Sequence, residues 1–279
     1  MHMTQTEKAE RFRALHARAG AFLIPNPWDA GTARILTNLG FEALTTTSAG
    51  LAFSLGRPDG AHAVSREEAL ANAKAIADAT DLPVAADLEN GFGDTPRDAA
   101  ETIRLAGEMA GLVGGSIEDA TGDERHPIYD FQQAVERIAA AAEAARALPY
   151  PFMLVGRAEN FLHGRPDLDD TIRRLQAYEA AGADVLFAPG LTRAEDIRAV
   201  CGAVGKPVNM VMGLKSAPFS LAQLAEFGVK RISVGAALSR FALGAFVEAA
   251  REMREHGTFG FADRALPFDE ATRLVSTAP

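Results

Sequence analysis

The 279-residue sequence contains one cysteine, Cys201. A single cysteine excludes an internal disulfide and a zinc site built from several cysteines. No run approaches the roughly 20 uninterrupted apolar residues that a membrane span needs. The first residues, MHMTQTEKAERFR, are polar and charged and lack the apolar core of a secretory signal peptide. We therefore expect a cytoplasmic protein that is not inserted in a membrane.

Positive charge is scarce as well, because 28 Lys and Arg residues stand against 37 Asp and Glu, a formal net charge of −9. Non-specific nucleic-acid binding needs clustered positive charge, so this balance argues against a nucleic-acid partner. Only five lysines occur; four fall outside the predicted strand ends and Lys215 lies in a loop, which disfavours a Schiff-base aldolase. With 48% hydrophobic residues the chain can bury a sizeable core, and we expect an enzyme.

Short apolar runs alternate along the chain with longer segments of helical periodicity. Eight runs indicate strands, at 21–25, 43–47, 83–87, 114–118, 153–157, 185–188, 207–211 and 231–234. Alanine-rich segments between them carry helical spacing, for example 65–79, 131–147 and 168–181. Eight strand–helix units without a linker predict one α/β domain, a (β/α)₈ barrel over residues 1–257. A doubly wound open sheet is the alternative, but its Gly-x-Gly-x-x-Gly turn is missing after the first strand.

A tail of residues 258–279 follows Gly257 and contains Phe259, Phe261, Leu266 and Phe268. This tail is too long and too apolar to remain without contacts. We expect it to pack on the barrel or on a partner subunit, with a lid over the barrel of its own chain as the alternative.

Acidic side chains follow three neighbouring predicted strands at their carboxyl ends, where barrel enzymes place catalytic groups. Asp59 comes after strand 43–47, Asp87 and Glu89 after strand 83–87, and Glu118 ends strand 114–118. Like charges at one rim repel one another unless a cation lies among them. Oxygen ligands without His or Cys suit Mg²⁺ or Mn²⁺, bound directly or through water. We predict a metal site here; loop carboxylates and helix N-caps are the alternative for any single residue.

The same rim carries groups that suit an anionic substrate. Arg157 ends strand 153–157 and can bind a carboxylate or phosphoryl group in bidentate fashion, or form a structural salt bridge to Glu118 or Glu159. The run 47–49 offers small side chains and backbone N–H groups to an anion, or forms a plain turn. The candidate substrate-binding residues are Trp28, Thr47, Ser48, Ala49 and Arg157.

The run Asp87-Leu88-Glu89-Asn90-Gly91-Phe92-Gly93 resembles the D-x-D/E-x-G-Y/F-G signature of the isocitrate lyase/phosphoenolpyruvate mutase superfamily. Further similar stretches span nearly the whole chain: PNPWDAGTARI, TTTSAG, SLGRPDG, SIEDA, LVGRAENF, GADVLFAPG and KRISVGAALSR. The resemblance implies a barrel, Mg²⁺ dependence and a small 2-oxo or 2-hydroxy carboxylate substrate. It also implies a homodimer or homotetramer in which the last barrel helix and the C-terminal tail are exchanged between subunits.

Carried over by position, the resemblance implies that Asp87 holds the metal ion, assisted directly or through water by Asp59, Glu89 and Glu118. Thr47, Ser48 and Ala49 would bind the acid group of the substrate, and Arg157 would anchor a carboxylate. The catalytic roles would fall to Asp59, Glu118 and Arg157.

The sequence departs from the superfamily in two places. The lyases carry a K-K-C-G-H lid motif, whereas residues 120–127 here read ATGDERHP, without Lys or Cys. At the end of the sixth strand the phosphonomutases have His and the lyases Glu, but this chain has Pro189, and the usual polar group of the seventh strand is replaced by Val211. The metal and anion groups are thus present, and the groups that distinguish the known activities are not.

This reduced site favours a Mg²⁺-dependent C–C lyase or decarboxylase that acts on an oxaloacetate-like acid through a metal-stabilised enolate. Stabilising an enolate on a metal ion demands little of a precisely positioned acid or base. A phosphoenolpyruvate or phosphonopyruvate mutase or hydrolase, acting on a phosphonate, is the alternative. That chemistry needs a further group, which Thr121, Arg125 or His126 in the lid loop 119–130 would have to supply. A third hypothesis is a barrel that binds 2-oxo acids without catalysis.

Overall fold

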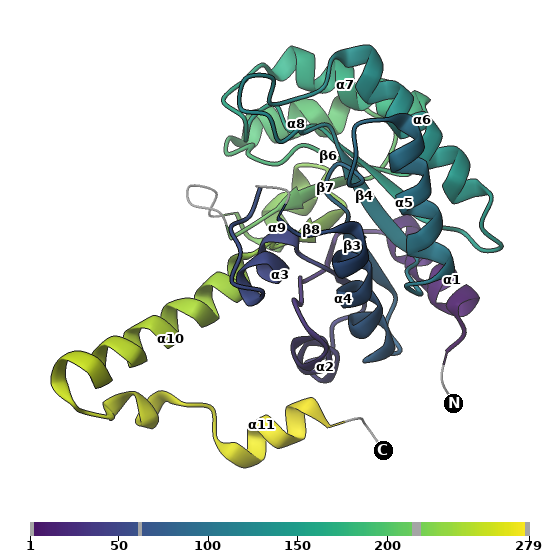
Figure 1. The fold of residues 1–279 in the computed structure, drawn as a ribbon. Helices are drawn as coiled ribbons and strands as arrows, with labels where there is room; N and C mark the ends of the chain where they lie inside the picture. Colours follow the sequence, from purple (N-terminus) through teal and green to yellow (C-terminus); the bar gives the residue numbers. More distant parts are fainter. Residues whose placement is uncertain (1–2, 61–62, 214–218, 277–279) are drawn as a thin grey trace.

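The computed structural model describes residues 3–60, 63–213 and 219–276. Its centre is an eight-stranded parallel sheet in the order β1-β8-β7-β6-β5-β4-β3-β2 (Figure 1). The strands are β1 (Phe22–Leu23), β2 (Leu44–Thr45), β3 (Val84–Asp87), β4 (Gly114–Glu118), β5 (Met153–Arg157), β6 (Val185–Phe187), β7 (Val208–Val211) and β8 (Arg231–Ser233). The two ends of the sheet meet where the Thr45 amide donates to the Pro25 carbonyl at 3.1 Å. The predicted (β/α)₈ barrel is confirmed.

Helices between the strands cover the outside of the barrel. They are α2 (Ala30–Asn38), α3 (Ser48–Ser54), α4 (Arg66–Asp78), α5 (Pro96–Glu108), α6 (Phe131–Arg146), α7 (Leu168–Ala180), α8 (Ala194–Ala203) and α9 (Leu221–Glu226). The three helices predicted by range occur as α4, α6 and α7. Ser65 and Thr95 cap α4 and α5 by accepting hydrogen bonds from the amides of Glu68 and Asp98, each at 3.2 Å.

The segment after β2 differs from expectation. Residues 48–54 form the short helix α3, so the loop toward Asp59 begins later than the sequence predicted. Thr47 starts this helix, because its hydroxyl accepts the Gly50 amide at 3.2 Å. The backbone N–H groups near Ser48 are therefore those of a helix N-terminus at the barrel rim.

The N-terminal helix α1 (Gln5–Ala17) covers the amino end of the barrel. Lys8 donates to the Thr80 carbonyl at 2.7 Å and Gln5 to the Leu112 carbonyl at 3.1 Å, and both carbonyls precede strands. Phe12 is fully buried, and a Cβ on Gly114 of β4 would lie 3.0 Å from its ring. Close packing at this end leaves the carboxyl ends of the strands to form the open face.

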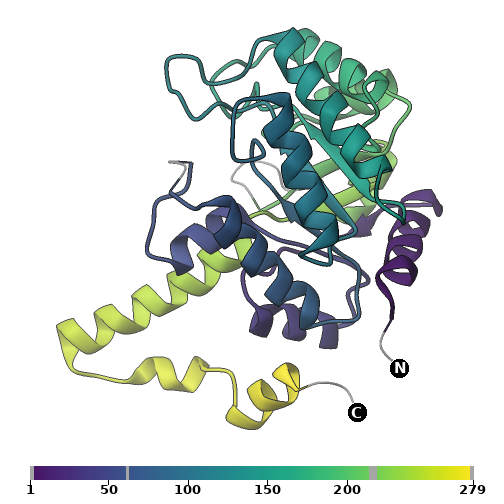
Figure 2. The same cartoon turned by 45° about the vertical axis from the view of Figure 1, so that its right-hand side comes forward.

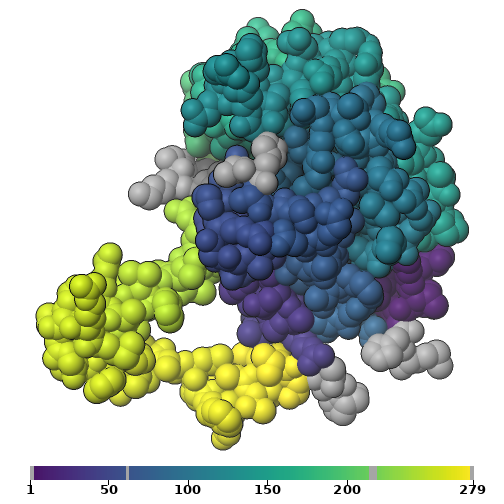
Figure 3. Space-filling model, in the orientation of Figure 1, coloured from purple at the N-terminus to yellow at the C-terminus, as the bar shows by residue number. Residues whose placement is uncertain are grey.

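The C-terminal segment forms an arm that leaves the barrel. It comprises α10 (Ala237–His256), the short 3₁₀ helix η1 (Gly260–Arg264) and α11 (Phe268–Val275). Figure 3 shows an opening between this arm and the body, and Figure 2 shows α11 returning below α2. Asn38 of α2 donates to the carbonyls of Leu274 and Ser276 at 2.7 and 2.9 Å. The described tail thus contacts α2, and none of residues 258–276 forms a lid over the barrel.

No helix in the described parts of the chain combines the length and the apolar character that a membrane span requires.

Candidate active site

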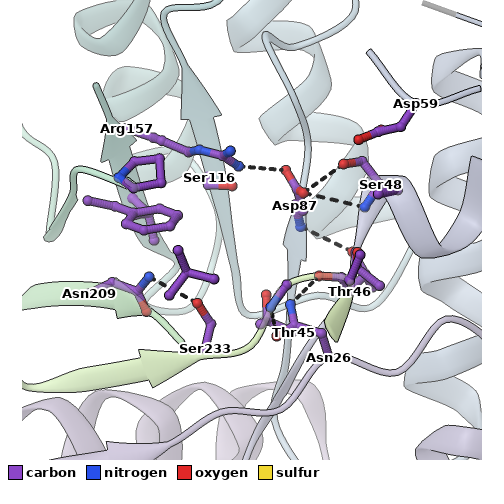
Figure 4. A pocket seen from close by; sticks show the side chains of 18 of the residues that line it. Asn26, Thr45, Thr46, Ser48, Asp59, Asp87, Ser116, Arg157, Asn209 and Ser233 are labelled. Atoms are coloured by element: carbon purple, nitrogen blue, oxygen red, sulfur yellow. Dashed lines mark hydrogen bonds and ion pairs between the residues drawn. The ribbon is translucent and has the colours of Figure 1, made fainter. Parts of the chain in front are cut away.

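A cavity of about 400 Å³ opens among the carboxyl ends of the strands (Figure 4). Asp59, Asp87 and Arg157 contribute charged groups to its lining, whereas Pro189 and Val211 contribute apolar ones. Strands β2 through β5 therefore bring together the rim that the sequence predicted.

Asp87 is held in one orientation by its neighbours on β2 and α3. The Ser48 hydroxyl donates to Oδ2 of Asp87 at 2.9 Å, and the Ser48 amide donates to the same oxygen at 3.3 Å. The Glu89 amide donates to Oδ1 at 3.3 Å, and the Asp87 amide itself donates to the Thr46 hydroxyl at 3.1 Å. Asp87 thus presents a fixed carboxylate to the cavity, as Figure 4 shows.

Arg157 is the cationic centre of the site. Its Nη1 lies 3.0 Å from Oε2 of Glu118 and 3.5 Å from Oδ1 of Asp87, and its Nε donates to Glu159. Burial disfavours the charged guanidinium, but the carboxylates of Glu118, Glu159 and Asp87 outweigh burial and raise the pKa of Arg157. Both salt bridges considered from the sequence are present, and the same side chain also lines the cavity.

Glu89 and Glu118 add negative charge beside Asp87, although neither is among the described residues that line the cavity. Burial, reinforced by the charges of Asp87 and Asp59, raises the pKa of Glu89 to about 7. Burial raises the pKa of Glu118 well above its ordinary value, and the nearby carboxylates add to the shift. Glu89 also has a φ of 48°, a left-handed conformation that is uncommon outside glycine and that clusters at functional sites.

These carboxylates fit a hard divalent cation that makes few direct contacts with protein. Within the described ranges, no three His, Cys, Asp or Glu side chains converge closely enough to ligate one ion together. Mg²⁺ usually retains several waters and uses one or two carboxylates directly. Asp87 suits direct ligation because it lines the cavity and Ser48 holds its carboxylate in one orientation. Asp59, Glu89 and Glu118 would assist directly or through water. Burial raises the pKa of Asp59 as it does that of Glu89, and the charge of Asp87 adds to both shifts; a cation would offset that charge.

The structure brings most of the candidate substrate-binding residues to the cavity. Thr47, Ser48 and Ala49 line it together with Arg157. Trp28 is not among the described lining residues; its Cβ lies against Gly50, where an added Cβ would be 3.0 Å away.

Of the departures from the superfamily, those at the ends of β6 and β7 lie in the cavity lining, whereas the lid loop lies outside it. Pro189 and Val211 line the cavity and offer no side-chain proton donor or acceptor. In the lid loop, Arg125 and His126 are exposed and contact Asp123, and neither is among the described residues that line the cavity. Thr121 lines a separate hollow beside Asn90 and Phe92.

Sequence reasoning missed several polar residues in the lining, among them Asn26, Arg231 and Arg240. Asn26 ties the barrel ends together, since it donates to the Thr46 carbonyl at 2.8 Å and accepts two backbone amides from the end of β8. Arg231 is buried at the start of β8, and Arg240 is exposed near the start of α10. A charged residue inside the apolar run at 231–234 was the available signal for Arg231.

The fold and the site define a (β/α)₈-barrel protein with acidic side chains at the carboxyl ends of its strands. Residues 12–254 match the family model described as phosphoenolpyruvate phosphomutase, and the chain belongs to this family. The resemblance to the isocitrate lyase/phosphoenolpyruvate mutase superfamily is thereby confirmed.

Two curated relatives and two solved structures illustrate the similarity. A probable 2-methylisocitrate lyase 1 of Corynebacterium glutamicum is 31% identical over 92% of this chain and 85% of its own. An oxaloacetate decarboxylase of Bradyrhizobium diazoefficiens is 29% identical over 74% and 71%. A putative lyase/mutase from Burkholderia cenocepacia J2315 is 62% identical, with a TM-score of 0.94 and 96% coverage of both chains. A phosphonopyruvate hydrolase solved with oxalate and Mg²⁺ is 25% identical, with a TM-score of 0.84 over 98% and 95%. These relatives are enzymes and include lyases, so the expected enzyme class is confirmed.

Proposed function

We propose that this protein is a Mg²⁺-dependent lyase that breaks a C–C bond in a small 2-oxo dicarboxylate, in the simplest case by decarboxylating oxaloacetate. One observation carries the proposal. The cavity combines a fixed carboxylate, Asp87, with apolar residues, Pro189 and Val211, at the positions where the superfamily resemblance implies polar groups. The oxaloacetate decarboxylase relative supports the choice of substrate.

The protein's own residues divide the task between holding and orienting. Asp87 is the residue that would hold the ion, and Ser48 fixes the direction of its carboxylate at 2.9 Å. When bound, Mg²⁺ supplies Lewis-acid polarisation of a 2-oxo group. Arg157 provides positive charge next to Asp87 and can anchor a substrate carboxylate, while Glu118 and Glu159 keep its guanidinium in place. Phe187 lies 5.1 Å from that guanidinium and limits its exposure to water.

The alternative of a phosphonopyruvate-type mutase or hydrolase has support from the hydrolase relative. In this structure, however, none of the three lid residues that would have to supply its additional group is among the described residues that line the cavity, and Thr121 lines a separate hollow. Arg125 and His126 have side chains that are 85% and 82% exposed. The geometry therefore favours C–C chemistry.

The proposal is tested by incubating the purified protein with Mg²⁺ and oxaloacetate and coupling the pyruvate formed to lactate dehydrogenase. We expect pyruvate formation well above the background of Mg²⁺ alone, and its loss in Asp87→Ala and in EDTA. Equal rates for wild type and Asp87→Ala, at the background level, would overturn the proposal. Release of phosphate or phosphoenolpyruvate from phosphonopyruvate would favour the alternative, and binding of 2-oxo acids without any turnover would favour the non-catalytic barrel.

We also infer a homodimer or homotetramer in which α10 packs on another copy of the chain. The arm exposes large apolar side chains; Phe241 and Phe246 are 81% and 69% exposed, and among the described residues of α10 only Ser239 is buried. On the barrel, Leu23 of β1 is 39% exposed although it lies in a barrel strand. We expect light scattering to show an oligomer that Phe241→Glu weakens; a wild-type monomer at micromolar concentration would contradict the inference. The cytoplasmic location stays the prediction made from the sequence.

A further inference from the structure

The inner end of the cavity carries a buried arginine that the proposed chemistry does not use. Arg231 is the first residue of β8 and is 4% exposed, yet it belongs to the cavity lining. Its Nε and Nη1 atoms have no hydrogen-bond partner among the described residues. Arg231 therefore lines the cavity as a buried guanidinium whose Nε and Nη1 atoms are shielded from water and have no acceptor among the described residues.

Arg231 differs in this respect from Arg157. Three carboxylates surround Arg157 and raise its pKa. For Arg231 the single cause of the shift is burial, which lowers its pKa to about 10 and leaves it charged at neutral pH. The guanidinium carbon lies 5.9 Å from the centre of the Phe12 ring. Burial, with the charge of Arg231, lowers the pKa of the neighbouring His16 to about 3 and keeps its ring neutral. No negative charge of the described chain compensates this cation.

An unpaired buried cation is costly, because removing a charge from water is compensated only by a partner of opposite charge or by several hydrogen bonds. A ligand that enters the cavity can be that partner. The other cavity arginine toward the mouth, Arg240, is exposed and remains solvated. Arg157 is already bound to Glu118 and Glu159. Of these three arginines of the described cavity lining, Arg231 is thus the one that is buried and also has N–H groups without an acceptor.

The residues beside Arg231 are also polar. Asn209 of β7 is its register partner, and Ser233 follows two residues later on β8. Asn209 donates to the Ser233 hydroxyl at 3.1 Å, and both residues line the cavity (Figure 4). This polar inner end lies apart from the rim, where Asp59 and Asp87 gather the negative charge.

We propose that Arg231 binds the second carboxylate of the substrate, so that the protein selects dicarboxylates over monocarboxylates. The inference rests on the proposed function for the other end of the substrate. There the first carboxylate and the 2-oxo group of the substrate would lie near Asp87. A planar guanidinium with unoccupied N–H groups matches a carboxylate in bidentate geometry. Binding would pair the buried cation and satisfy donors that otherwise lack acceptors.

The experiment compares two ligands that differ only at the far end. Malate and 2-hydroxybutyrate share a four-carbon chain, a 2-hydroxyl group and a first carboxylate, but malate ends in a carboxylate and 2-hydroxybutyrate in a methyl group. Calorimetry with Mg²⁺ is expected to show tighter binding of malate by the wild type. Arg231→Met is expected to weaken malate binding about tenfold to hundredfold, the range of a hydrogen-bonded charge, and to leave 2-hydroxybutyrate binding unchanged. Arg231→Lys should retain part of the preference.

Stability provides a readout that a purely structural role would not give. Without ligand, Arg231→Met is expected to be at least as stable as the wild type, because the substitution removes an unpaired buried charge of similar volume. Arg104→Met, which removes an exposed arginine of α5, is the matched control and should leave both ligand affinities unchanged.

Three results would overturn the inference: equal wild-type affinity for the two ligands, equal weakening of both by Arg231→Met, or an unchanged preference in a destabilised variant. If Arg231→Met does not fold, the Arg231→Lys variant decides. The inference is overturned if Arg231→Lys keeps both the full wild-type affinity for malate and the full preference for malate over 2-hydroxybutyrate. Calorimetry needs no turnover, so the two proposals can fail separately. If the protein does not decarboxylate oxaloacetate but prefers malate in a way that depends on Arg231, the proposed function is refuted and this inference is supported.

Discussion

The Nη1 atom of Arg157 lies 3.0 Å from Oε2 of Glu118, and the two side chains are only 16% and 15% exposed. This pair ends two adjacent strands, since Glu118 and Arg157 are register partners in β4 and β5. A buried pair of this kind loses much more when one partner is removed than a surface pair does, because the remaining charge has no compensation.

We expect Arg157→Met to destabilise the metal-free protein by about 3–5 kcal/mol, since Glu118 and Glu159 would remain buried without a cation. Mg²⁺ should restore part of this loss if it binds next to Asp87. Urea unfolding in EDTA and in Mg²⁺ measures both quantities. Arg104→Met, which breaks exposed pairs with Glu101 and Glu108, is expected to cost less than about 1 kcal/mol in either buffer. Equal losses for the two variants would contradict the role given to Arg157.

Ser48→Ala tests how strongly the orientation of Asp87 matters. Groups that orient a metal-binding carboxylate typically contribute about 10–100-fold to metal affinity or activity, so we expect a decrease of that size in Mg²⁺ affinity and in kcat/KM. The unfolding free energy should change by roughly 1 kcal/mol, the contribution of one hydrogen bond. Ser54→Ala is the control, because Ser54 donates to the Leu51 carbonyl within the same helix and does not touch Asp87. Similar kinetics for both variants would argue against a positioning role.

The neighbours Glu118 and Asp119 show what the sequence could and could not predict. The apolar runs located all eight strands, and the strand order in a barrel then placed the carboxylates at one rim. Side chains alternate along a strand, however, and no local pattern says which of two consecutive acids joins the Arg157 cluster at the rim. Glu118 contacts Arg157, whereas Asp119 turns toward α7 and accepts hydrogen bonds from the Tyr178 hydroxyl and Arg174.

The role of Arg231 was hidden for a related reason. A charged residue at the start of an apolar strand is as compatible with a surface salt bridge as with the barrel interior. Only the register of β8 against Asn209 of β7, together with the fully buried Phe12 of α1, shows that the side chain lies inside. Likewise, the departure of α10 from the barrel depends on tertiary contacts that local helical spacing does not encode.

The network around Asp119 leads to a prediction about stability. Tyr178 donates its hydroxyl to the buried Asp119 carboxylate at 2.6 Å. Tyr150 is hydrogen-bonded to neutral groups, Gln5 and the Leu112 carbonyl. Because hydrogen bonds to charged groups contribute more, Tyr178→Phe should cost about 1.5–3 kcal/mol and Tyr150→Phe about 0.5–1.5 kcal/mol in urea unfolding. The reverse order would show that Asp119 is neutral or solvated in the folded protein.

His16 predicts a specific pH dependence of stability. Its side chain is buried in α1, its Nδ1 donates to the Phe12 carbonyl at 2.8 Å, and burial, with the charge of Arg231, lowers its pKa from 6.5 to about 3. Above pH 6.5 the ring is neutral in both the folded and the unfolded state, so it contributes no pH dependence. Between pH 6.5 and about 3 only the unfolded state takes up the proton, so the unfolding free energy falls as the pH is lowered.

Because His16 takes up one proton in the unfolded state with a pKa near 6.5, we expect the unfolding free energy to fall by about 2 kcal/mol between pH 7 and pH 5 on its account. His16→Gln removes this titration, and its unfolding free energy should therefore change by about 2 kcal/mol less than that of the wild type over the same interval. Urea unfolding at pH 7, 6 and 5 measures the difference. His256→Gln alters an exposed histidine at the end of α10 and should follow the wild-type curve. A His16→Gln curve parallel to the wild type would mean that the folded protein accommodates the protonated ring, and the buried cation of Arg231 would then have to lie farther from His16 than the structure places it.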